Sequence, residues 1–421
     1  MAKIKQIVSR EILSCKGDPT IETSVFLDDA TVGTASCPVG TSVGVYEAAA
    51  LTDKDSTRFG GLGVLKAIEN IQSQIAPQLI GIDAEKQGEI DKIMINIDGT
   101  QNKSRLGANA ILSVSMATAK AAANSSVLPL FLYLRQFIKE GSSTDGLKIP
   151  IPLFNLINGG AHAKGTLSIQ EFLAIPASFK TYTESLKIGV VLYKSLQKLL
   201  DSMELSTLVG DEGGFSPKLK SNADVFSILT QAINHTSVRM EYDVFFGLDC
   251  AAANFFKDKK YYIRDESQPL SAEELISYYE NLNKNYHFLY VEDPFNEEDW
   301  NSWSQLSAKM SQTTIIVGDD LTATNPYRLQ MALDNKAVTG IIIKPNQIGT
   351  VIETLAVVEV AKQAGLKVIV SHRSGETNDD FIADFAVAVS ADYVKFGAPV
   401  RGERVAKYNR LLQIESQIKA L

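Results

Sequence analysis

The chain has 421 residues, of which 45% are hydrophobic and 21% are charged, and its formal net charge is −8. This composition is typical of a globular protein, and the length allows two or three domains. The acidic balance argues against general nucleic-acid binding, which needs a basic face. No apolar run reaches the ~20 residues of a membrane span. The three cysteines form no CxxC pair and the first residues lack the apolar core of a signal peptide, so we expect a cytoplasmic protein. A pool of the protein at the cell surface or outside the cell would leave no recognisable motif in the sequence.

The first third of the chain predicts a small α+β domain. Residues 3–30 read as strands, residues 64–80 carry apolar positions at helical spacing, and residues 107–123 form a helix of small residues. The segment 141–146 is polar and turn-rich, and it follows a helix that we expect to end near residue 140. We therefore predict an N-terminal domain of residues 1–140 and a second domain of residues 141–421.

The second domain contains six strand-like apolar runs, each ending in a residue that can do chemistry. These residues are Asp249, Glu292, Asp319, Lys344, His372 and Lys395. Their spacing is close to the period of a (β/α)₈ barrel, about 31 residues per unit. The segments before them, 149–156 and 167–177, are followed by two long helical stretches, which predicts a barrel that is irregular in its first two units. Barrel enzymes place their active sites at the carboxyl ends of the strands, so we expect the six residues to share one mouth.

Three acids at the ends of successive repeat units favour a cation site. Asp249, Glu292 and Asp319 are hard oxygen ligands, which suit Mg²⁺ better than Zn²⁺. Each acid taken alone is also compatible with a helix cap or a surface charge. Lys344 ends an apolar run, so a nearby cation and partial burial would lower its pKa and let it act as a base on a carbon acid. A lysine with only a structural role is the alternative.

Two further segments suggest acid catalysis and anion binding. Glu212 lies in a glycine-rich loop and Glu171 follows Gln170 in the second barrel segment, so the two carboxyl groups can share a proton, unless both are simply solvated. Residues 371–377 place Arg373 and Ser374 at a strand–helix turn, which suits a phosphate group, although a helix cap is an equal alternative.

At these motifs the sequence closely resembles the enolase family. The resemblance runs nearly from end to end, through Asn158–His162, Gly210–Phe215, Val291–Phe295, Gly318–Asn325, Lys344–Thr350 and Ser371–Thr377. It implies an α+β domain capping an irregular barrel, and the Mg²⁺-dependent, reversible dehydration of 2-phospho-D-glycerate to phosphoenolpyruvate in glycolysis and gluconeogenesis. It also implies a homodimer, with an octamer as the alternative.

The resemblance implies a role for each site residue. Asp249, Glu292 and Asp319 would hold one Mg²⁺, and Ser42 would help to hold a second that arrives with substrate. Lys344 would remove the C2 proton, and Glu212, assisted by Glu171, would protonate the departing C3 hydroxyl. The residues expected to bind or enclose the substrate are His162, Gln170, His372, Arg373, Ser374 and Lys395.

The loop of residues 38–44 departs from the family pattern. It reads Pro-Val-Gly-Thr-Ser-Val-Gly, where the family usually has Pro-Ser-Gly-Ala-Ser-Thr-Gly, so Ser42 is retained between changed neighbours. Lys16 also occupies a position where the family has arginine. Lysine cannot form the bidentate contacts of an arginine guanidinium, so any such contact there is weakened. No catalytic group is lost through these changes, and they indicate a divergent enzyme.

Two other functions are compatible with the motifs. The first is a related lyase or racemase that acts on another acid, but Arg373 and Ser374 favour a phosphorylated substrate. The second is a binding or scaffold protein that has kept the fold without activity. Such a protein would be expected to have lost at least one of Lys344, Glu212 or Asp319, and all three are present.

Overall fold

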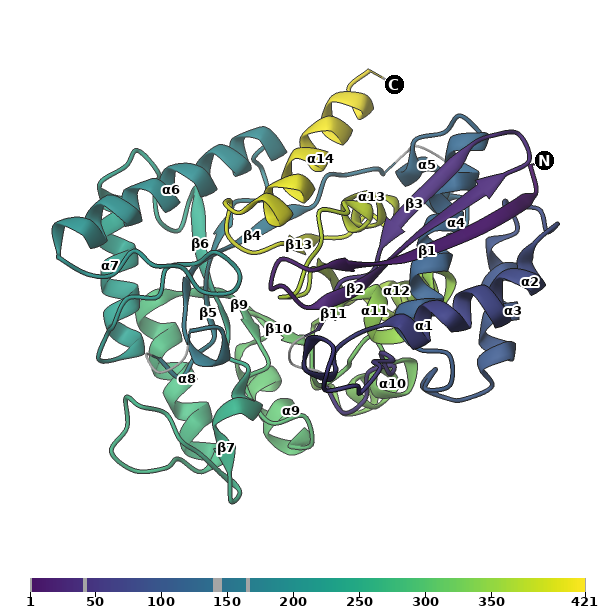
Figure 1. Cartoon of the computed structure of the whole chain (residues 1–421). Coiled ribbons are helices and arrows are strands. Elements are labelled where there is room, and N and C mark those ends of the chain that lie inside the picture. Colours follow the sequence, from purple (N-terminus) through teal and green to yellow (C-terminus); the bar gives the residue numbers. More distant parts are fainter. Residues whose placement is uncertain (1, 41–43, 139–145, 164–166, 421) are drawn as a thin grey trace.

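The computed structural model describes residues 2–40, 44–138, 146–163 and 167–420. The N-terminal domain and the barrel lie side by side (Figure 1), with the first strands at one edge of the molecule and the C-terminal helix on the barrel. The N-terminal domain contains β1 (Ile4–Leu13), β2 (Pro19–Leu27), β3 (Val32–Ser36), α1 (Leu65–Asn70), α2 (Ala76–Leu79), α3 (Gln87–Asp98), α4 (Ala108–Ser125) and α5 (Leu130–Arg135).

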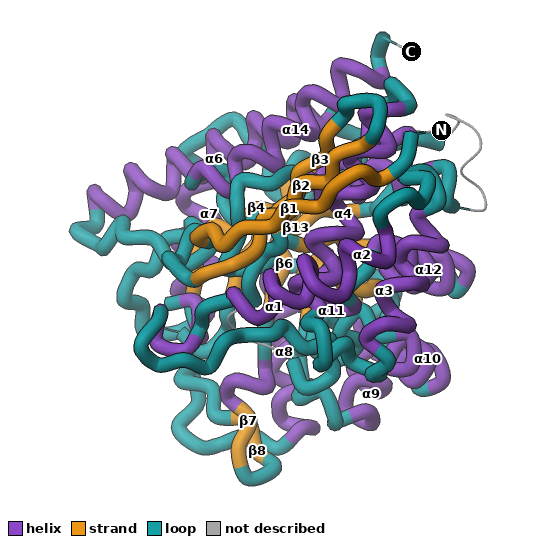
Figure 2. The backbone as a smooth tube through the Cα atoms, turned by 45° about the vertical axis from the view of Figure 1, so that its right-hand side comes forward, coloured by secondary structure: helices purple, strands orange, loops and turns teal. Residues whose placement is uncertain are grey.

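The N-terminal sheet is antiparallel in the order β1-β2-β3, and α4 packs against β2 and β3 (Figure 2). The small residues of α4 allow this close packing. A Cβ atom on Gly33 of β3 would lie 2.1 Å from the Ala121 backbone nitrogen, so only glycine fits there. The helix expected over 64–80 is interrupted by a π-helical turn, Ile71–Ile75, and Pro77 follows it in the first turn of α2.

The second domain is a closed eight-stranded barrel in the order β10-β11-β12-β13-β4-β5-β6-β9. Its strands are β4 (Ile151–Asn158), β5 (Glu171–Pro176), β6 (Val244–Asp249), β9 (Phe288–Glu292), β10 (Ile315–Gly318), β11 (Gly340–Ile343), β12 (Lys367–Ser371) and β13 (Tyr393–Lys395). The pairs β4–β5 and β5–β6 are antiparallel, and the other neighbours are parallel. The predicted irregularity of the first two units is therefore confirmed.

Helices surround the barrel, which matches the predicted α/β class (Figure 2). They are α6 (Tyr182–Ser202), α7 (Asn222–Asn234), α8 (Ala272–Tyr286), α9 (Trp300–Met310), α10 (Pro326–Asp334), α11 (Pro345–Ile348), α12 (Val351–Gln363), α13 (Phe381–Ala388) and α14 (Gly402–Ile418). A two-stranded hairpin, β7 (Phe256–Lys257) and β8 (Lys260–Tyr261), lies outside the barrel. Helices α6, α7 and α8 each begin with a capping box, which satisfies their first backbone N–H groups.

The barrel interior is filled and is not a pore. Its inner layer consists of Leu153, Leu173, Ile175, Tyr290, Val317, Ile342, Ile369 and Tyr393. These side chains close the barrel below the mouth, so small molecules can reach only its rim. None of the described helices is long and apolar enough to cross a membrane.

The linker predicted at residues 141–146 falls almost entirely outside the described residues. Helix α5 ends at Arg135, five residues before the position expected for its end, and β4 begins at Ile151. The boundary between residues 140 and 141 stays a prediction.

Candidate active site

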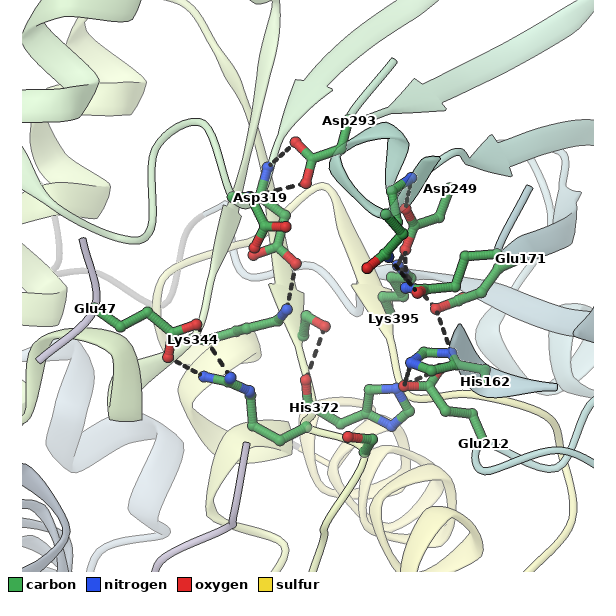
Figure 3. A pocket seen from close by; sticks show the side chains of 17 residues that line it. Glu47, His162, Glu171, Glu212, Asp249, Asp293, Asp319, Lys344, His372 and Lys395 are labelled. Carbon is green, nitrogen blue, oxygen red and sulfur yellow. Dashed lines mark hydrogen bonds and ion pairs between the residues drawn. The ribbon is translucent and has the colours of Figure 1, made fainter. Parts of the chain in front are cut away.

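The carboxyl ends of the barrel strands meet in a small polar cavity of about 60 Å³. Asp249, Glu292 and Lys395 are the last residues of their strands, and Asp319, Lys344 and His372 directly follow theirs. Figure 3 shows the result: Lys344 and Asp319 lie on one side, and Glu171, His162 and Glu212 on the other. The cavity is lined by most residues that the sequence analysis selected, namely His162, Gln170, Glu171, Glu212, Asp249, Asp319, Lys344, His372, Arg373, Ser374 and Lys395. Ser42 lies outside the described residues.

Lys395 lies among three acids at the centre of the mouth. Its Nζ is 2.6 Å from Asp249 Oδ2, 2.9 Å from Glu292 Oε2 and 3.2 Å from Glu171 Oε1. Burial alone would lower the pKa of Lys395, but these carboxylates raise it well above its ordinary value. Lys395 therefore remains a cation. Gln170, on the rim, contacts Asp249 through its amide nitrogen at 3.5 Å.

Lys344 forms a short ion pair with Asp319, and the amide of Gln347 donates to the other oxygen of that carboxylate at 3.1 Å. Burial lowers the pKa of the lysine and Asp319 raises it, and the net pKa is above the ordinary value. The lowered pKa expected from the sequence is therefore not found in this arrangement, because Asp319 is engaged by the lysine itself.

The opposite side of the mouth is an acid–imidazole cluster. His162 lies between two glutamates, with Nδ1 3.6 Å from Glu171 Oε1 and Nε2 3.9 Å from Glu212 Oε1. Burial and the charge of Glu212 raise the pKa of Glu171 well above its ordinary value. Burial would also raise the pKa of Glu212, but the neighbouring His372 and His162 outweigh it and hold that pKa well below the ordinary value. The pKa values of the two carboxyl groups are therefore shifted in opposite directions, which favours a proton on Glu171 over one on Glu212.

His372 lies beside this cluster as an uncharged ring. Arg404 Nη1 lies 2.8 Å from His372 Nδ1, so this ring nitrogen accepts and the proton is on Nε2. Nε2 lies 3.1 Å from Glu212 Oε2. Burial lowers the pKa of His372 to about 4, so the ring is uncharged at neutral pH. Sequence reasoning missed Arg404, which is fully buried and lies 32 residues away from His372 along the chain.

Arg373 is held by a residue of the N-terminal domain. Glu47 approaches both terminal nitrogens of the guanidinium, at 2.7 and 3.1 Å, and Asn346 accepts from Nη1 at 3.2 Å. Gly40 packs directly on this group, because a Cβ there would lie 2.1 Å from Nη2. Ser374 lines the same cavity. No sequence pattern indicates a role for Glu47, since the contact spans 326 residues.

The mouth holds far more acid than base. Among the described residues that line the cavity, seven are carboxylic acids and three are lysine or arginine. Asp293 and Asp320 were not selected from the sequence, although each directly follows a selected acid. With Asp319 they form a group whose oxygens lie within 4.8 Å of one another. Burial and this crowding raise the pKa of Asp320 to about 7, and burial and Asp249 raise the pKa of Glu292 to about 8.

The donor set fits a hard divalent cation. Acids whose pKa values are raised by mutual repulsion are stabilised by a positive ion, and carboxylate oxygens are the ligands that Mg²⁺ prefers. Of the three acids predicted as metal ligands, Asp319 belongs to the compact group, whereas Asp249 and Glu292 both contact Lys395. The residues present can therefore hold a cation if the lysines give up these contacts.

The fold and the site together define the class. A (β/α)₈ barrel with an α+β domain beside its mouth, and with acids and lysines at the strand ends, has the layout of a barrel enzyme with its active site at the carboxyl ends of the strands.

Comparison with known proteins identifies the family to which the chain belongs. Residues 4–134 match the family described as "Enolase, N-terminal domain", and residues 146–420 match "Enolase, C-terminal TIM barrel domain". A curated protein named "Enolase" from Acidothermus cellulolyticus (strain ATCC 43068 / DSM 8971 / 11B) is 47% identical over 418 residues, which cover 99% of this chain and 95% of that protein. The chain belongs to the enolase family.

Proposed function

We propose that this protein is a lyase that catalyses the reversible dehydration of 2-phospho-D-glycerate to phosphoenolpyruvate. The observation that carries the proposal is the opposition of two groups across one mouth in a chain of the enolase family. Lys344 lies on one side and the Glu171–Glu212 pair on the other (Figure 3). The reaction needs such a pair, because a proton leaves C2 and a hydroxyl leaves C3.

Lys344 accepts the C2 proton in this proposal. The ion pair with Asp319 keeps the lysine charged in the substrate-free arrangement. When Asp319 binds a cation instead, Lys344 loses this partner, and burial then favours its neutral amine. Arg373 also lowers the pKa of Lys344. Lys344 can therefore act as a base only when Asp319 binds a cation.

Glu212 and Glu171 supply the proton that leaves with the C3 hydroxyl as water. In this proposal the pair shares one proton, and His162 lies between the two carboxyl groups at 3.6 and 3.9 Å. A proton moved from Glu171 to Glu212 would make Glu212 the general acid. The His372 ring would lie beside the ionised Glu212 after the transfer, since Nε2 is 3.1 Å from Oε2.

Asp249, Glu292 and Asp319 would hold Mg²⁺, with Ser42 as a further ligand of a second ion. Mg²⁺ held there would supply positive charge to the carboxylate of the substrate. Lys395 would lie near the substrate carboxylate as a second positive charge.

Arg373 and Ser374 would bind the phosphate group, and His162 and Gln170 would enclose the substrate. Arginine suits this role because its planar fork matches phosphate oxygens. The Glu47 carboxylate engages that fork in the described structure. Phosphate therefore has to share or replace this contact.

We further propose a cytoplasmic homodimer. The three cysteines are free, which suits a reducing compartment. Val8 and Leu13 are 43% and 58% exposed on β1, an outer strand of the described three-stranded sheet, and an apolar strand edge is commonly covered by a partner.

The direct test is phosphoenolpyruvate formation by the purified protein from 2-phospho-D-glycerate, followed by ultraviolet absorbance with and without Mg²⁺. The proposal predicts product that requires Mg²⁺. Folded protein that forms no product in excess Mg²⁺ would contradict it. Glycerate without the phosphate tests the alternative of a different acid substrate, and proton exchange on that compound alone would favour the alternative.

A further inference from the structure

A tyrosine in the barrel interior, Tyr290, contacts one of the acids at the mouth. It lies on β9 two residues before Glu292, so both side chains point to the same face of the strand. Tyr290 is fully buried in the inner layer of the barrel. Its hydroxyl donates to Glu292 Oε2 over 2.6 Å. The phenol therefore links an apolar layer to the polar mouth above it.

The neighbouring strand is shaped to accept this ring. Gly247 on β6 pairs with Tyr290, and a Cβ at Gly247 would lie 3.1 Å from the Tyr290 Cβ and 2.8 Å from the Ile175 Cδ1. A side chain at position 247 would displace the tyrosine or the isoleucine. The glycine thus leaves room for a large residue beneath Glu292.

Glu292 has two kinds of partner. Lys395 Nζ lies 3.0 Å from Oε1 and 2.9 Å from Oε2, and Tyr290 bonds Oε2. The lysine contact is an ion pair that a bound cation would replace. The tyrosine contact is a hydrogen bond from a fully buried hydroxyl, and it does not depend on the lysine.

We propose that Tyr290 is a positioning residue for the metal site, which holds the Glu292 carboxylate in the orientation needed for a divalent cation after Lys395 has moved away. The proposal rests on the assignment of Glu292 as a Mg²⁺ ligand in the proposed function. Partners that orient a metal ligand commonly change metal affinity about 10- to 100-fold when they are removed. A phenylalanine would fill the same space, so packing alone does not explain the hydroxyl.

The test is Tyr290→Phe, with Tyr393→Phe as the matched control. Tyr393 belongs to the same inner layer and also lies two residues before a residue of the mouth, Lys395, but among the described residues its hydroxyl makes no hydrogen bond to an acid. Calorimetric titration of the substrate-free proteins with MgCl₂ would give the Mg²⁺ dissociation constants. Circular dichroism melting curves would check the fold, and phosphoenolpyruvate formation against Mg²⁺ concentration would separate kcat from the metal requirement.

We expect Tyr290→Phe to weaken Mg²⁺ binding about 10-fold or more and to shift the Mg²⁺ dependence of activity equally, with kcat at saturating Mg²⁺ close to wild type. Tyr393→Phe should leave both unchanged. Equal Mg²⁺ affinity in wild type and Tyr290→Phe, or equal weakening by both substitutions, would overturn the inference and leave the proposed function intact. Wild-type protein that neither binds Mg²⁺ nor forms product would overturn both.

Discussion

Lys344 is subject to two opposing effects on its pKa. Burial favours the neutral amine, and the carboxylate of Asp319 favours the ammonium ion and prevails in the described arrangement. Lys344 would therefore become a neutral base only when Asp319 binds a cation. Without that cation it would not remove protons from other molecules.

Lys344→Ala removes the base and should lower the C2 proton exchange of 2-phospho-D-glycerate by a factor of about 10²–10⁴. Exchange in D₂O, followed by NMR, measures this step without the later loss of hydroxide. Lys336→Ala, a change in the turn after α10, is the matched control and should exchange like wild type. Exchange at the wild-type rate in Lys344→Ala would exclude the lysine as the base.

Glu47 compensates a buried arginine in the absence of substrate. Both side chains of the Glu47–Arg373 pair are about 5% exposed or less, so Glu47→Gln leaves a buried guanidinium without its carboxylate. We expect a loss of about 3 kcal/mol in the free energy of unfolding. Inorganic phosphate should restore more stability to Glu47→Gln than it adds to wild type, because it replaces the missing charge. Urea unfolding with and without phosphate measures this, and equal phosphate effects in the two proteins would contradict it.

At this scale the sequence predicts residues whose chemistry is tied to a strand end, such as Asp249 and Lys344. It does not predict residues that act through contacts between distant segments. Glu47 reaches Arg373 from another domain, and Arg404 reaches His372 from a helix that follows the barrel. Asp293 and Asp320 could have been predicted from the sequence, because each directly follows an acid at a strand end.

At the level of elements, an ion pair with little exposure to solvent joins the N-terminal domain to the barrel. Lys120 on α4 lies 2.9 Å from Asp379, which precedes α13 and also accepts from the Ser36 backbone nitrogen at 2.9 Å. Burial raises the pKa of Asp379, but Lys120 outweighs burial and the net pKa is lowered.

Lys120→Met should destabilise the protein by about 3 kcal/mol near pH 7, because it leaves the Asp379 charge buried without its cation. A carboxyl group with a lowered pKa contributes stability above its ordinary pKa of about 3.9 and loses that contribution as the pH falls through its folded value. The difference between wild type and variant should therefore shrink below pH 4. Urea unfolding at pH 7 and pH 3.5 measures both values, and a constant difference would show that Asp379 is not the group involved.

The strands of the barrel could be predicted well because each is a short apolar run that ends in a functional residue. The expected runs ending at Asp249, Glu292 and Lys395 coincide with β6, β9 and β13. The helix over 64–80 was predicted as one element, but a π-helical turn divides it, since apolar spacing does not report how the backbone hydrogen bonds shift.

At the scale of the whole molecule, the N-terminal domain contributes to the site and does more than cover it. Glu47 and Gly40 both contact the arginine that we assign to phosphate. The class and order of the domains were predictable from sequence patterns. The contact of Glu47 with Arg373 was not, because it depends on how the N-terminal domain packs against the barrel.

We expect the chain to be a dimer in solution. Light scattering after size-exclusion chromatography should give a mass near twice the 45.9 kDa of one chain. Arginine at the exposed strand position, Val8→Arg, should shift the mass toward one chain if β1 is covered by the partner. A wild-type mass of one chain would contradict the dimer, and an unchanged mass in Val8→Arg would place the interface elsewhere.

In the proposed mechanism, proton removal and hydroxyl loss take place on opposite sides of the mouth. Glu212→Gln separates the two steps when C2 exchange and phosphoenolpyruvate formation are compared by NMR in D₂O with 2-phospho-D-glycerate and Mg²⁺. We expect product formation to fall by a factor of about 10²–10⁴ while C2 exchange continues, because Lys344 is intact. Equal loss of exchange and product formation in a folded Glu212→Gln protein would contradict the division between the two sides.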